Sequence, residues 1–320
     1  MQEKGGGEMK YIFKKLCTLI ITLFIVSLLA FCAFQVIGDP TSAILGTNAT
    51  PEKIAALQHE LGFDRPLPVR YGEWLLNFLQ GDMGTSYSYH MPVADMVGEK
   101  LPITFLLTLM AFVLTVVVSI PLGILTAKRE GGVFDRIMTV LDQIVMSIPP
   151  FFIGILLTCF FGLVLHVFQP GSFDAVQGHP LQFLLYMLFP ALSIAIPRIA
   201  MTVKMLRSSI LEQMSQDYIR TAYSRGHDRN GVLWGHALRN ALIPVVTFVA
   251  VSVAEMVAGS IVVEQIFSLP GIGRLLLASI GSRDFPVVLA IVVILALWVI
   301  VVNFIADVLY QYIDPRIRLN

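Results

Sequence analysis

Six long apolar runs constrain the fold of this 320-residue chain more than any other feature. A transmembrane helix needs about 20 consecutive, mostly apolar residues. The chain is also 56% hydrophobic and 14% charged, whereas soluble domains are about 45–50% apolar and about 25% charged. We therefore predict an all-α polytopic membrane protein with six transmembrane helices. These helices are expected within residues 16–38, 101–127, 143–168, 181–196, 241–263 and 287–306.

The mostly polar residues 39–100 predict an extracytoplasmic helical subdomain between the first two spans. Thr50-Pro51 indicates a helix start there, because Thr caps helices and Pro suits the first helical position. Ile54, Leu57 and Leu61 would form the apolar face of that helix, and a second helix is expected near residues 69–80. The predicted parts of the chain are a flexible N-terminus (1–10), the first transmembrane helix (11–38), the subdomain (39–100), a five-helix transmembrane core with a charged loop at 215–240 (101–309), and a cytoplasmic tail (310–320).

Breaks are expected at two places in the predicted core. Pro149-Pro150 should interrupt the third span near one membrane face, because proline lacks a backbone donor and clashes with the preceding turn. Asp135 and Asp142 flank an amphipathic helix that leads into this span. Residues 264–286 are expected to form an external loop.

The distribution of basic residues predicts the topology. Cytoplasmic loops carry an excess of Lys and Arg. If both termini lie inside, only six of the 22 basic residues lie outside, and four of those fall in the long first loop, where the rule is weak. Arg198 is counted inside, at the exit of the fourth span. We predict a multi-pass cell-membrane protein with cytoplasmic N- and C-termini.

A charged insert at residues 215–244 separates the fourth and fifth spans. Gly226 is typical of a helix stop, which predicts a short helix, a turn, and a second helix that feeds the fifth span. Tyr218, Ala222 and Arg225 would share one face of the short helix. The simpler alternative is a solvated loop that only fixes the topology.

The sequence RTAYSRG at residues 220–226, followed by HALRNALIP at 236–244, resembles the cytoplasmic loop of permease subunits of ATP-binding-cassette importers. The similarity is greatest to the dipeptide, oligopeptide and nickel branch. Further motifs agree in order between Tyr11 and Arg318: GDP at 38–40, TPE at 50–52, LGFDRPLPVRYGEWL at 61–75, GDMGTS at 81–86, Ser-Ile-Pro at 147–149 with Phe151, and FSLPGIG at 267–273. The resemblance implies the type I importer permease fold.

The resemblance also implies that the short helix is a coupling helix that docks on an ATPase subunit. Arg220-Thr221-Ala222 stands where the wider superfamily has Glu-Ala-Ala, so no docking carboxylate is expected. Arg239 and Asn240 are either an elbow that transmits motion or residues that snorkel and cap, and His236 is either a contact or a packing residue. The expected coupling residues are Asp217, Tyr218, Arg220, Thr221, Ala222, Gly226, His236, Arg239, Asn240 and Pro244.

Motifs for catalysis are absent from the sequence. There is no G-x-x-x-x-G-K-[ST], H-E-x-x-H or G-x-S-x-G. Cys17, Cys32 and Cys159 lie in apolar runs and suggest neither a disulfide nor a metal site. We expect no enzyme activity, no bound metal and, at zero net charge, no nucleic-acid partner. ATP and Mg²⁺ would be bound by partner subunits.

Glu255 is an acidic residue inside the apolar fifth span. Acidic groups within a membrane usually face a cavity or a partner, so we expect Glu255 to line the translocation path, where it could meet a cationic group of the substrate. The alternative is a structural hydrogen bond to a neighbouring helix. The family resemblance adds an outer gate around Glu264, Phe267, Pro270, Gly271 and Gly273, where Pro and Gly allow irregular backbone to line a cavity.

The predicted function is that of a permease subunit in an ATP-driven, binding-protein-dependent importer of di- and oligopeptides. Import of chelated nickel by the same family is the alternative, and an ion-coupled secondary transporter would require further ionisable groups and inverted repeats. A receptor or scaffold would not need a coupling loop. The expected partners are a second homologous permease, two ATP-binding subunits, an extracytoplasmic solute-binding protein and membrane lipid.

Overall fold

The computed structural model describes residues 2–37, 41, 50–60, 62–169, 171–176 and 178–313. Within these residues the structure is helical, and the β-type pairing is an isolated bridge between Thr85 and Pro92. Five helices are long and apolar enough to cross a membrane, or six if one bent pair counts as a span. The predicted fold class, an all-α polytopic membrane protein, is confirmed. The GDP motif at residues 38–40 and residues 314–320 of the expected tail lie outside the described residues.

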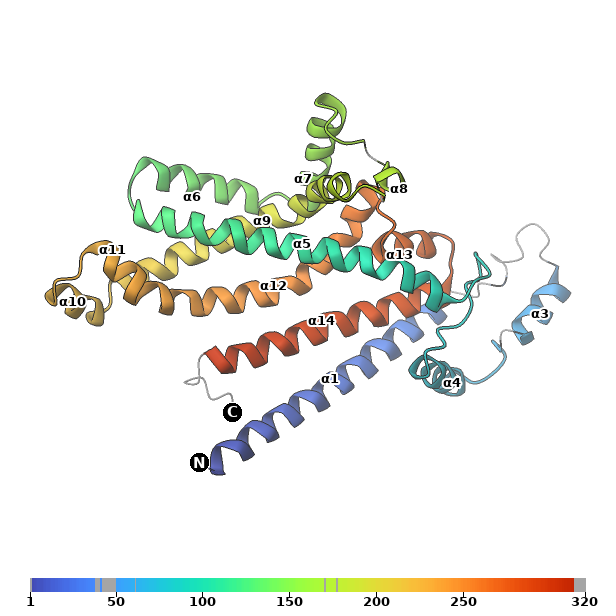
Figure 1. Ribbon diagram of the computed structural model, residues 1–320. Coiled ribbons are helices and arrows are strands. Elements are labelled where there is room, and N and C mark those ends of the chain that lie inside the picture. The colour runs from blue at the N-terminus through green and yellow to red at the C-terminus, as the bar shows by residue number, and fades with distance from the viewer. Residues whose placement is uncertain are drawn as a thin grey trace. The chain divides into compact units, whose positions relative to one another are not determined.

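Five long helices account for five of the predicted spans (Figure 1). They are α1 (Gln2–Ile37), α5 (Val93–Lys128), α9 (Pro180–Met214), α12 (Leu238–Ile266) and α14 (Phe285–Ile313). Helix α1 begins at Gln2, although we expected residues 1–10 to be flexible. Each residue added to an existing helix contributes one more backbone hydrogen bond, so the helix of the first span extends back into the Gly-rich start.

The chain folds as two compact units. The first comprises residues 1–103 and 270–301, and the second comprises residues 104–269 and 302–320. Helices α5 and α14 each contribute residues to both units.

The first unit contains three shorter helices, α3 (Pro51–Glu60), α4 (Leu67–Leu79) and α13 (Ile272–Gly281). Helix α3 begins at Pro51, as Thr50-Pro51 predicts, and the Thr50 carbonyl accepts a hydrogen bond from Ile54 N at 2.9 Å. Leu61, the last residue of its expected apolar face, lies outside the described residues. We expected residues 264–286 to form a loop, but they contain helix α13. This segment is helical because Leu275 and Leu276 bury an apolar face of the helix.

An aromatic cluster holds α4 against α1. Tyr71 is buried, and its ring lies edge-on to Phe24 and Phe31 at centroid distances of 5.8 and 5.5 Å. The Tyr71 hydroxyl also forms a 2.8 Å hydrogen bond with the Ser27 hydroxyl. Because the tyrosine buries its ring and satisfies its polar end, this contact fixes the packing of α4 on α1.

A buried carboxylate anchors the segment that precedes α5. Asp284 is fully buried at the start of α14 and accepts a hydrogen bond from the Ser86 hydroxyl. It also accepts hydrogen bonds from the backbone N–H groups of Tyr87 (3.0 Å) and Ser88 (3.2 Å). The GDMGTS segment is therefore tied to α14 by one side chain almost 200 residues later, because a buried charge is tolerated only when it is hydrogen-bonded.

The third span in the second unit is bent more sharply than expected. Helix α6 (Val133–Met146) is followed by α7 (Pro150–Leu157) and a π-helical segment, η2 (Thr158–Val164), and the two parts meet at 102°. The break that Pro149-Pro150 predicts in the third span is present, and the two helices count as one span only if the bent pair crosses the membrane together. Pro149 and Pro150 cannot continue the hydrogen-bond ladder of α6, so the apolar length is divided between two helices. A short helix, α8 (Phe173–Val176), follows.

Helix α6 is oriented with its carboxylates inward. Asp135 and Asp142 are buried, whereas Val133 and Val140 are 74% and 58% exposed. On a soluble protein the apolar face of the helix would be buried and the carboxylates would be exposed. The opposite arrangement seen in α6 is expected for a helix whose outer face contacts lipid acyl chains.

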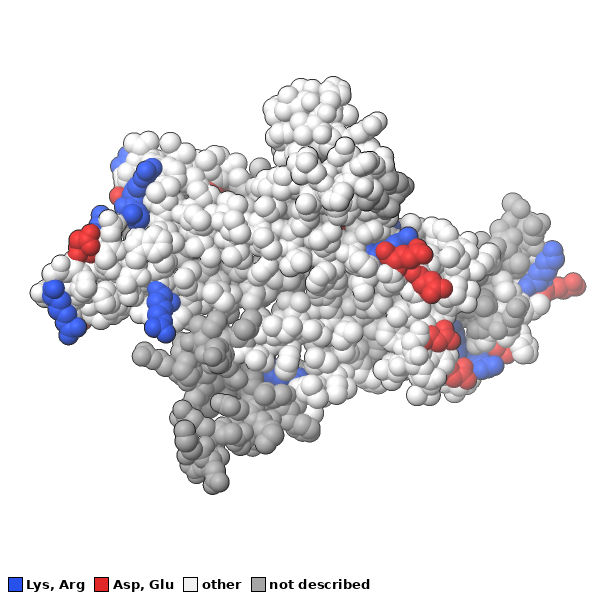
Figure 2. Space-filling view, viewed as in Figure 1, with Lys and Arg blue, Asp and Glu red and all other residues white. Residues whose placement is uncertain are grey.

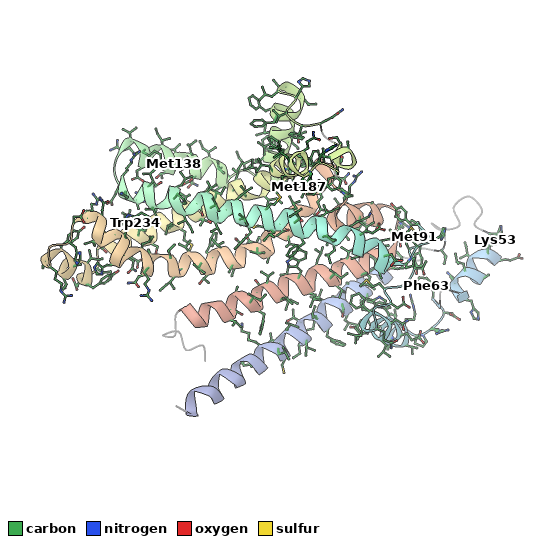
Figure 3. The ribbon with its side chains drawn as sticks, in the orientation of Figure 1. Lys53, Phe63, Met91, Met138, Met187 and Trp234 are labelled. Atoms are coloured by element: carbon green, nitrogen blue, oxygen red, sulfur yellow. The ribbon has the colours of Figure 1, made fainter. Side chains whose placement is uncertain are left out.

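Helix α9 is the core of the second unit and packs against α6, α7 and α12. Side chains along it, such as Met187, are enclosed by neighbouring helices (Figure 3). Helix α5 approaches it closely at Gly123, where an added Cβ would lie 2.9 Å from Leu206 Cδ2. The expected fourth span ended before Pro197, but Pro190 and Pro197 both lie inside one continuous helix.

The Asp284 anchor can be tested by truncation. Asp284→Ala leaves the Ser86 hydroxyl and two backbone N–H groups without their acceptor, so we expect a loss of about 2–4 kcal/mol in the free energy of unfolding. Thermal denaturation of the detergent-purified protein should show a lower midpoint, and proteolysis should cut earlier within residues 82–92.

Asp82→Ala is the matched control for this test. Asp82 is exposed and accepts one hydrogen bond, from Gly84 N at 2.8 Å, so its loss should cost less than about 1 kcal/mol. Equal midpoints for Asp284→Ala and the unsubstituted protein would contradict the anchor.

Candidate functional site

The predicted coupling loop contains a short helix, α10 (Asp217–Ser224), at one end of the second unit (Figure 1). Ile219 and Ala222 are buried, at 1% and 5% exposure, whereas Tyr218, Arg220 and Tyr223 are exposed. Of the three residues expected to share one face of α10, Ala222 is buried, whereas Tyr218 and Arg225 are exposed. The two apolar residues at i, i+3 spacing face the protein, and the polar residues of α10 face outward.

Two apolar side chains attach α10 to the second unit. Ile219 and Ala222 belong to a buried cluster at the ends of the long helices. The other buried members of the cluster are Ile124, Ala127, Leu206, Ile210, Val232, Leu233, Ala237, Ala241, Val245 and Val249. Through this cluster α10 is connected to the ends of α5, α9 and α12, and its nearest neighbours are α11 and η3.

Gly226 ends α10 in the way that the sequence predicts. Its φ is +89°, a conformation that favours glycine. Gly226 N donates to Tyr223 O at 2.9 Å, and His227 N donates to Ala222 O at 3.3 Å. This pair of bonds is the Schellman arrangement.

The chain then enters α11 (Arg229–Val232), which the Asp228 side chain caps by accepting from Gly231 N at 2.9 Å. A second π-helical segment, η3 (Leu233–Ala237), follows and leads into α12.

Polar contacts join α10 to the neighbouring helices. The Tyr218 hydroxyl donates to Gln213 Oε1 at 2.8 Å and accepts from Asn240 Nδ2 at 3.2 Å. Asn240 lies at the start of α12, and Gln213 lies at the end of α9, so one hydroxyl connects three helices. Of the residues expected at the elbow, Asn240 therefore contacts α10. Arg239 is exposed, and Pro244 lies within α12.

The remaining expected coupling residues surround this contact. Arg220 forms an exposed ion pair with Asp217 at 3.3 Å, and the Thr221 hydroxyl donates to the Asp217 carbonyl at 3.3 Å. The His236 ring lies 5.3 Å from the ring of His227, which favours packing for His236. Figure 2 shows Lys and Arg side chains, mixed with acidic ones, at the end of the second unit that bears α10.

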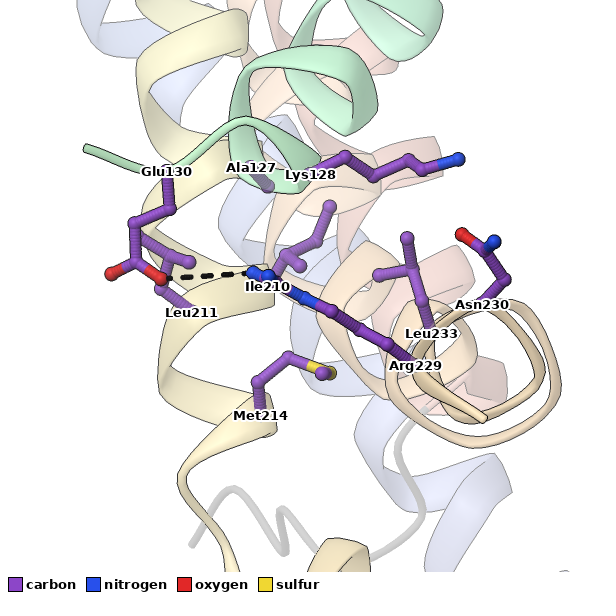
Figure 4. A pocket seen from close by; sticks show the side chains of 9 residues that line it. All are labelled: Ala127, Lys128, Glu130, Ile210, Leu211, Met214, Arg229, Asn230 and Leu233. Carbon is purple, nitrogen blue, oxygen red and sulfur yellow. Dashed lines mark ion pairs between the residues drawn. The ribbon is translucent and has the colours of Figure 1, made fainter. Parts of the chain in front are cut away.

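A small pocket lies beside α11 at the same end (Figure 4). Ile210, Met214 and Leu233 line it, and an ion pair between Arg229 and Glu130 at 4.0 Å crosses it. Both charged side chains are more than half exposed, so this pair contributes little to stability. It connects the turn after α5 to α11.

A stronger ion pair fixes α6 to α9. Arg207 Nη2 donates to Asp135 Oδ2 at 2.8 Å, and Arg207 Nε meets Oδ1 at 2.5 Å. Gly131 N also donates to Oδ2 at 2.8 Å. Since the Asp135 side chain is 5% exposed, this bidentate pair positions both helices and the turn before α6.

Glu255 is paired with Arg198, which the charge count had assigned to the cytoplasmic side. Helix α9 continues past Pro197 without a break, so Arg198 lies near its middle. There the guanidinium forms an ion pair with Glu255 of α12. The interhelical contact that we held as the alternative for Glu255 is therefore present, whereas the side of the membrane on which Arg198 lies stays a prediction.

The residues expected at an outer gate are largely packed. Glu264 is fully buried and accepts from the Thr104 hydroxyl at 2.6 Å. The Phe267 side chain is also buried, and its carbonyl accepts from the Tyr186 hydroxyl at 2.6 Å. These two residues belong to the second unit, whereas Pro270, Gly271 and Gly273 belong to the first, where Gly271 precedes α13.

Sequence reasoning missed Arg198, Asp284 and Ile219 as positioning residues. Only Ile219 carried a usable signal, its i, i+3 spacing from Ala222. Within the described residues, no group of three or more His, Cys, Asp or Glu side chains could hold a metal ion.

Comparison with known proteins covers nearly the whole chain. Residues 119–319 match the family described as binding-protein-dependent transport system inner membrane component, and residues 8–108 match its N-terminal counterpart. A putative peptide transport system permease protein of Brucella abortus is 37% identical, over 97% of this chain and 99% of its own length.

Two further relatives have similar coverage. The oligopeptide transport system permease protein AppB of Bacillus subtilis is 36% identical, over 96% of this chain and 99% of its own. The glutathione transport system permease protein GsiC of Salmonella choleraesuis is 35% identical, over 97% and 99%. With its apolar helices and these matches, the chain belongs to the family of binding-protein-dependent transport system inner membrane components, the permeases of ATP-binding-cassette importers.

Proposed function

We propose that this chain is a permease subunit through which an ATP-driven importer passes di- and oligopeptides. The observation that carries the proposal is the likeness, over 96–97% of the chain, to permeases named for peptide and oligopeptide transport. The nickel alternative is not favoured, because these relatives are named for the transport of peptides.

Helix α10 is the proposed docking element for an ATPase subunit. Its polar face is exposed, and its apolar face is fixed to the ends of α5, α9 and α12. The sequence has no phosphate-binding loop of its own. In this proposal two partner subunits bind ATP and Mg²⁺, and their closure moves α10. Tyr218 and the buried cluster then carry that motion to the spans as rigid-body rocking.

The same proposal fixes the orientation and the other partners. The end of the second unit that bears α10 faces the cytoplasm, as do both termini, in agreement with the excess of basic residues on that side. The segment containing α3 and α4 faces outward, where it helps to receive a solute-binding protein. A second homologous permease completes the transmembrane pathway.

The docking role predicts a loss of partner binding without a loss of stability. Arg220 and Tyr223 are exposed, at 79% of the side chain and 41% of the residue, so Arg220→Ala with Tyr223→Ala should change the free energy of unfolding by less than about 0.5 kcal/mol. We expect the ATPase subunit recovered with the affinity-purified permease to fall by about fivefold or more, because exposed aromatic and Arg residues commonly dominate interfaces.

Arg65→Ala provides the control for the docking variant. Arg65 is a similarly exposed arginine of the first unit and pairs with Glu73 at 3.0 Å. Its loss should leave ATPase recovery unchanged. Equal recovery from all three proteins would reject α10 as the docking element.

The substrate class can be tested by transport. Proteoliposomes that contain the complete importer, with ATP in the lumen and binding protein outside, should accumulate radiolabelled trialanine. Uptake should stop when ATP is replaced by a non-hydrolysable analogue, because no other energy source is expected. Uptake driven by a proton gradient without ATP, or accumulation of chelated nickel instead of peptide, would show that the proposed function is wrong.

A further inference from the structure

Arg198 and Glu255 place two opposite charges deep within membrane-spanning helices. Arg198 lies 18 residues after the first residue of α9 and 16 before the last, and Glu255 lies 11 residues before the last residue of α12. At about 1.5 Å per residue, each charge is roughly 15 Å or more from the nearest helix end. Both charges therefore lie well inside helices that are long and apolar enough to cross a membrane, and within such a span an unpaired charge is costly.

The two side chains differ in exposure. The Arg198 side chain is 17% exposed, whereas the Glu255 side chain is 56% exposed. Val251 and Val262 share the exposed face of α12 with Glu255, at 45% and 43%. An exposed carboxylate at this depth cannot face acyl chains without a large cost. This face of α12 therefore borders an aqueous path or another protein rather than lipid.

The ion pair leaves hydrogen-bonding capacity unused on both sides. Arg198 Nη1 meets Glu255 Oε2 and also lies 3.7 Å from Met201 Sδ. Among the described residues, no other polar group contacts Glu255, so Oε1 can accept a further donor. Arg198 Nε and Nη2 likewise have no acceptor within the described part of the chain. A carboxylate oxygen and guanidinium N–H groups are thus available side by side.

A short peptide carries the complementary groups at its two ends. The α-ammonium group is a cation, the α-carboxylate is an anion, and even an extended tripeptide spans at most about 10 Å. Resting on the peptide-permease function proposed above, we propose that Arg198 and Glu255 form a binding site for the termini of the transported peptide. Glu255 Oε1 binds the ammonium group, and Arg198 Nε and Nη2 bind the carboxylate.

This arrangement suits transport because the empty site remains neutral. When the peptide leaves, each side chain still has its partner, so no unpaired charge remains in the span. A purely structural pair would hold α9 against α12 in the same way, but it would not respond to the chemistry of the peptide ends.

Peptides with blocked ends separate these two roles. The complete purified importer, without binding protein, is titrated with trialanine, N-acetyl-trialanine and trialanine amide, and the shift in thermal denaturation midpoint gives an apparent affinity for each. The binding protein is omitted because its own preference for peptides with free termini would otherwise contribute to the apparent affinities. For the unsubstituted importer we expect each blocked peptide to bind about tenfold more weakly than trialanine, since each lacks one charge-assisted contact.

Substitutions should remove these differences selectively. In Glu255→Gln the penalty for acetylation should disappear while the penalty for amidation persists, and in Arg198→Gln the reverse is expected. The double variant Arg198→Gln/Glu255→Gln leaves no unpaired charge, so it assembles even if a single variant does not. It should bind all three peptides with equal affinity.

Asp135→Asn is the matched control, because it removes the carboxylate of the other interhelical pair on α9. It should lower the midpoint of the free protein but keep the order of the three affinities. Equal affinities in the unsubstituted importer, no binding of trialanine, or an unchanged order in the double variant would each overturn the site. Failure of binding-protein-dependent trialanine uptake by the same preparation would instead refute the peptide-import function.

Discussion

Two arginines on α9 determine how the second unit is assembled. Arg207 holds α6 through Asp135, and Arg198 holds α12 through Glu255. Within a membrane-spanning bundle a charge is tolerated only with a partner, because desolvation of a single ion costs several kcal/mol. The two pairs therefore constrain the rotation of α6 and α12 about their axes, and apolar packing fills the space between these fixed points. Polar chemistry, rather than hydrophobicity alone, specifies which faces of these helices meet.

Much of the fold follows from local patterns in the sequence. The long apolar runs correspond to helices, Thr50-Pro51 precedes α3, and Gly226 ends α10. These features depend on residues close together in the chain, whose effects can be read without tertiary information. Propensity and capping act within one turn of a helix, which explains why these predictions were confirmed.

Features that depend on distant partners were not predictable in the same way. A count of basic residues cannot reveal the ion pair between Arg198 and Glu255, because the two residues lie 57 positions apart. The GDMGTS segment reads as a turn, but its position depends on Asp284. At α10, two overlapping helical stripes were possible, and only the buried cluster selects Ile219 with Ala222. The role proposed for the loop rests on the family resemblance, whereas the packing of Ile219 and Ala222 fixes its orientation.

The contact at Gly123 limits how the spans can move. An added methyl group there would overlap Leu206, so α5 and α9 are in backbone-to-side-chain contact with no spare space. Two helices this close cannot slide or roll past each other without first separating. We therefore expect α5 and α9 to move together near Gly123, and a hinge that opens the pathway to lie away from this contact.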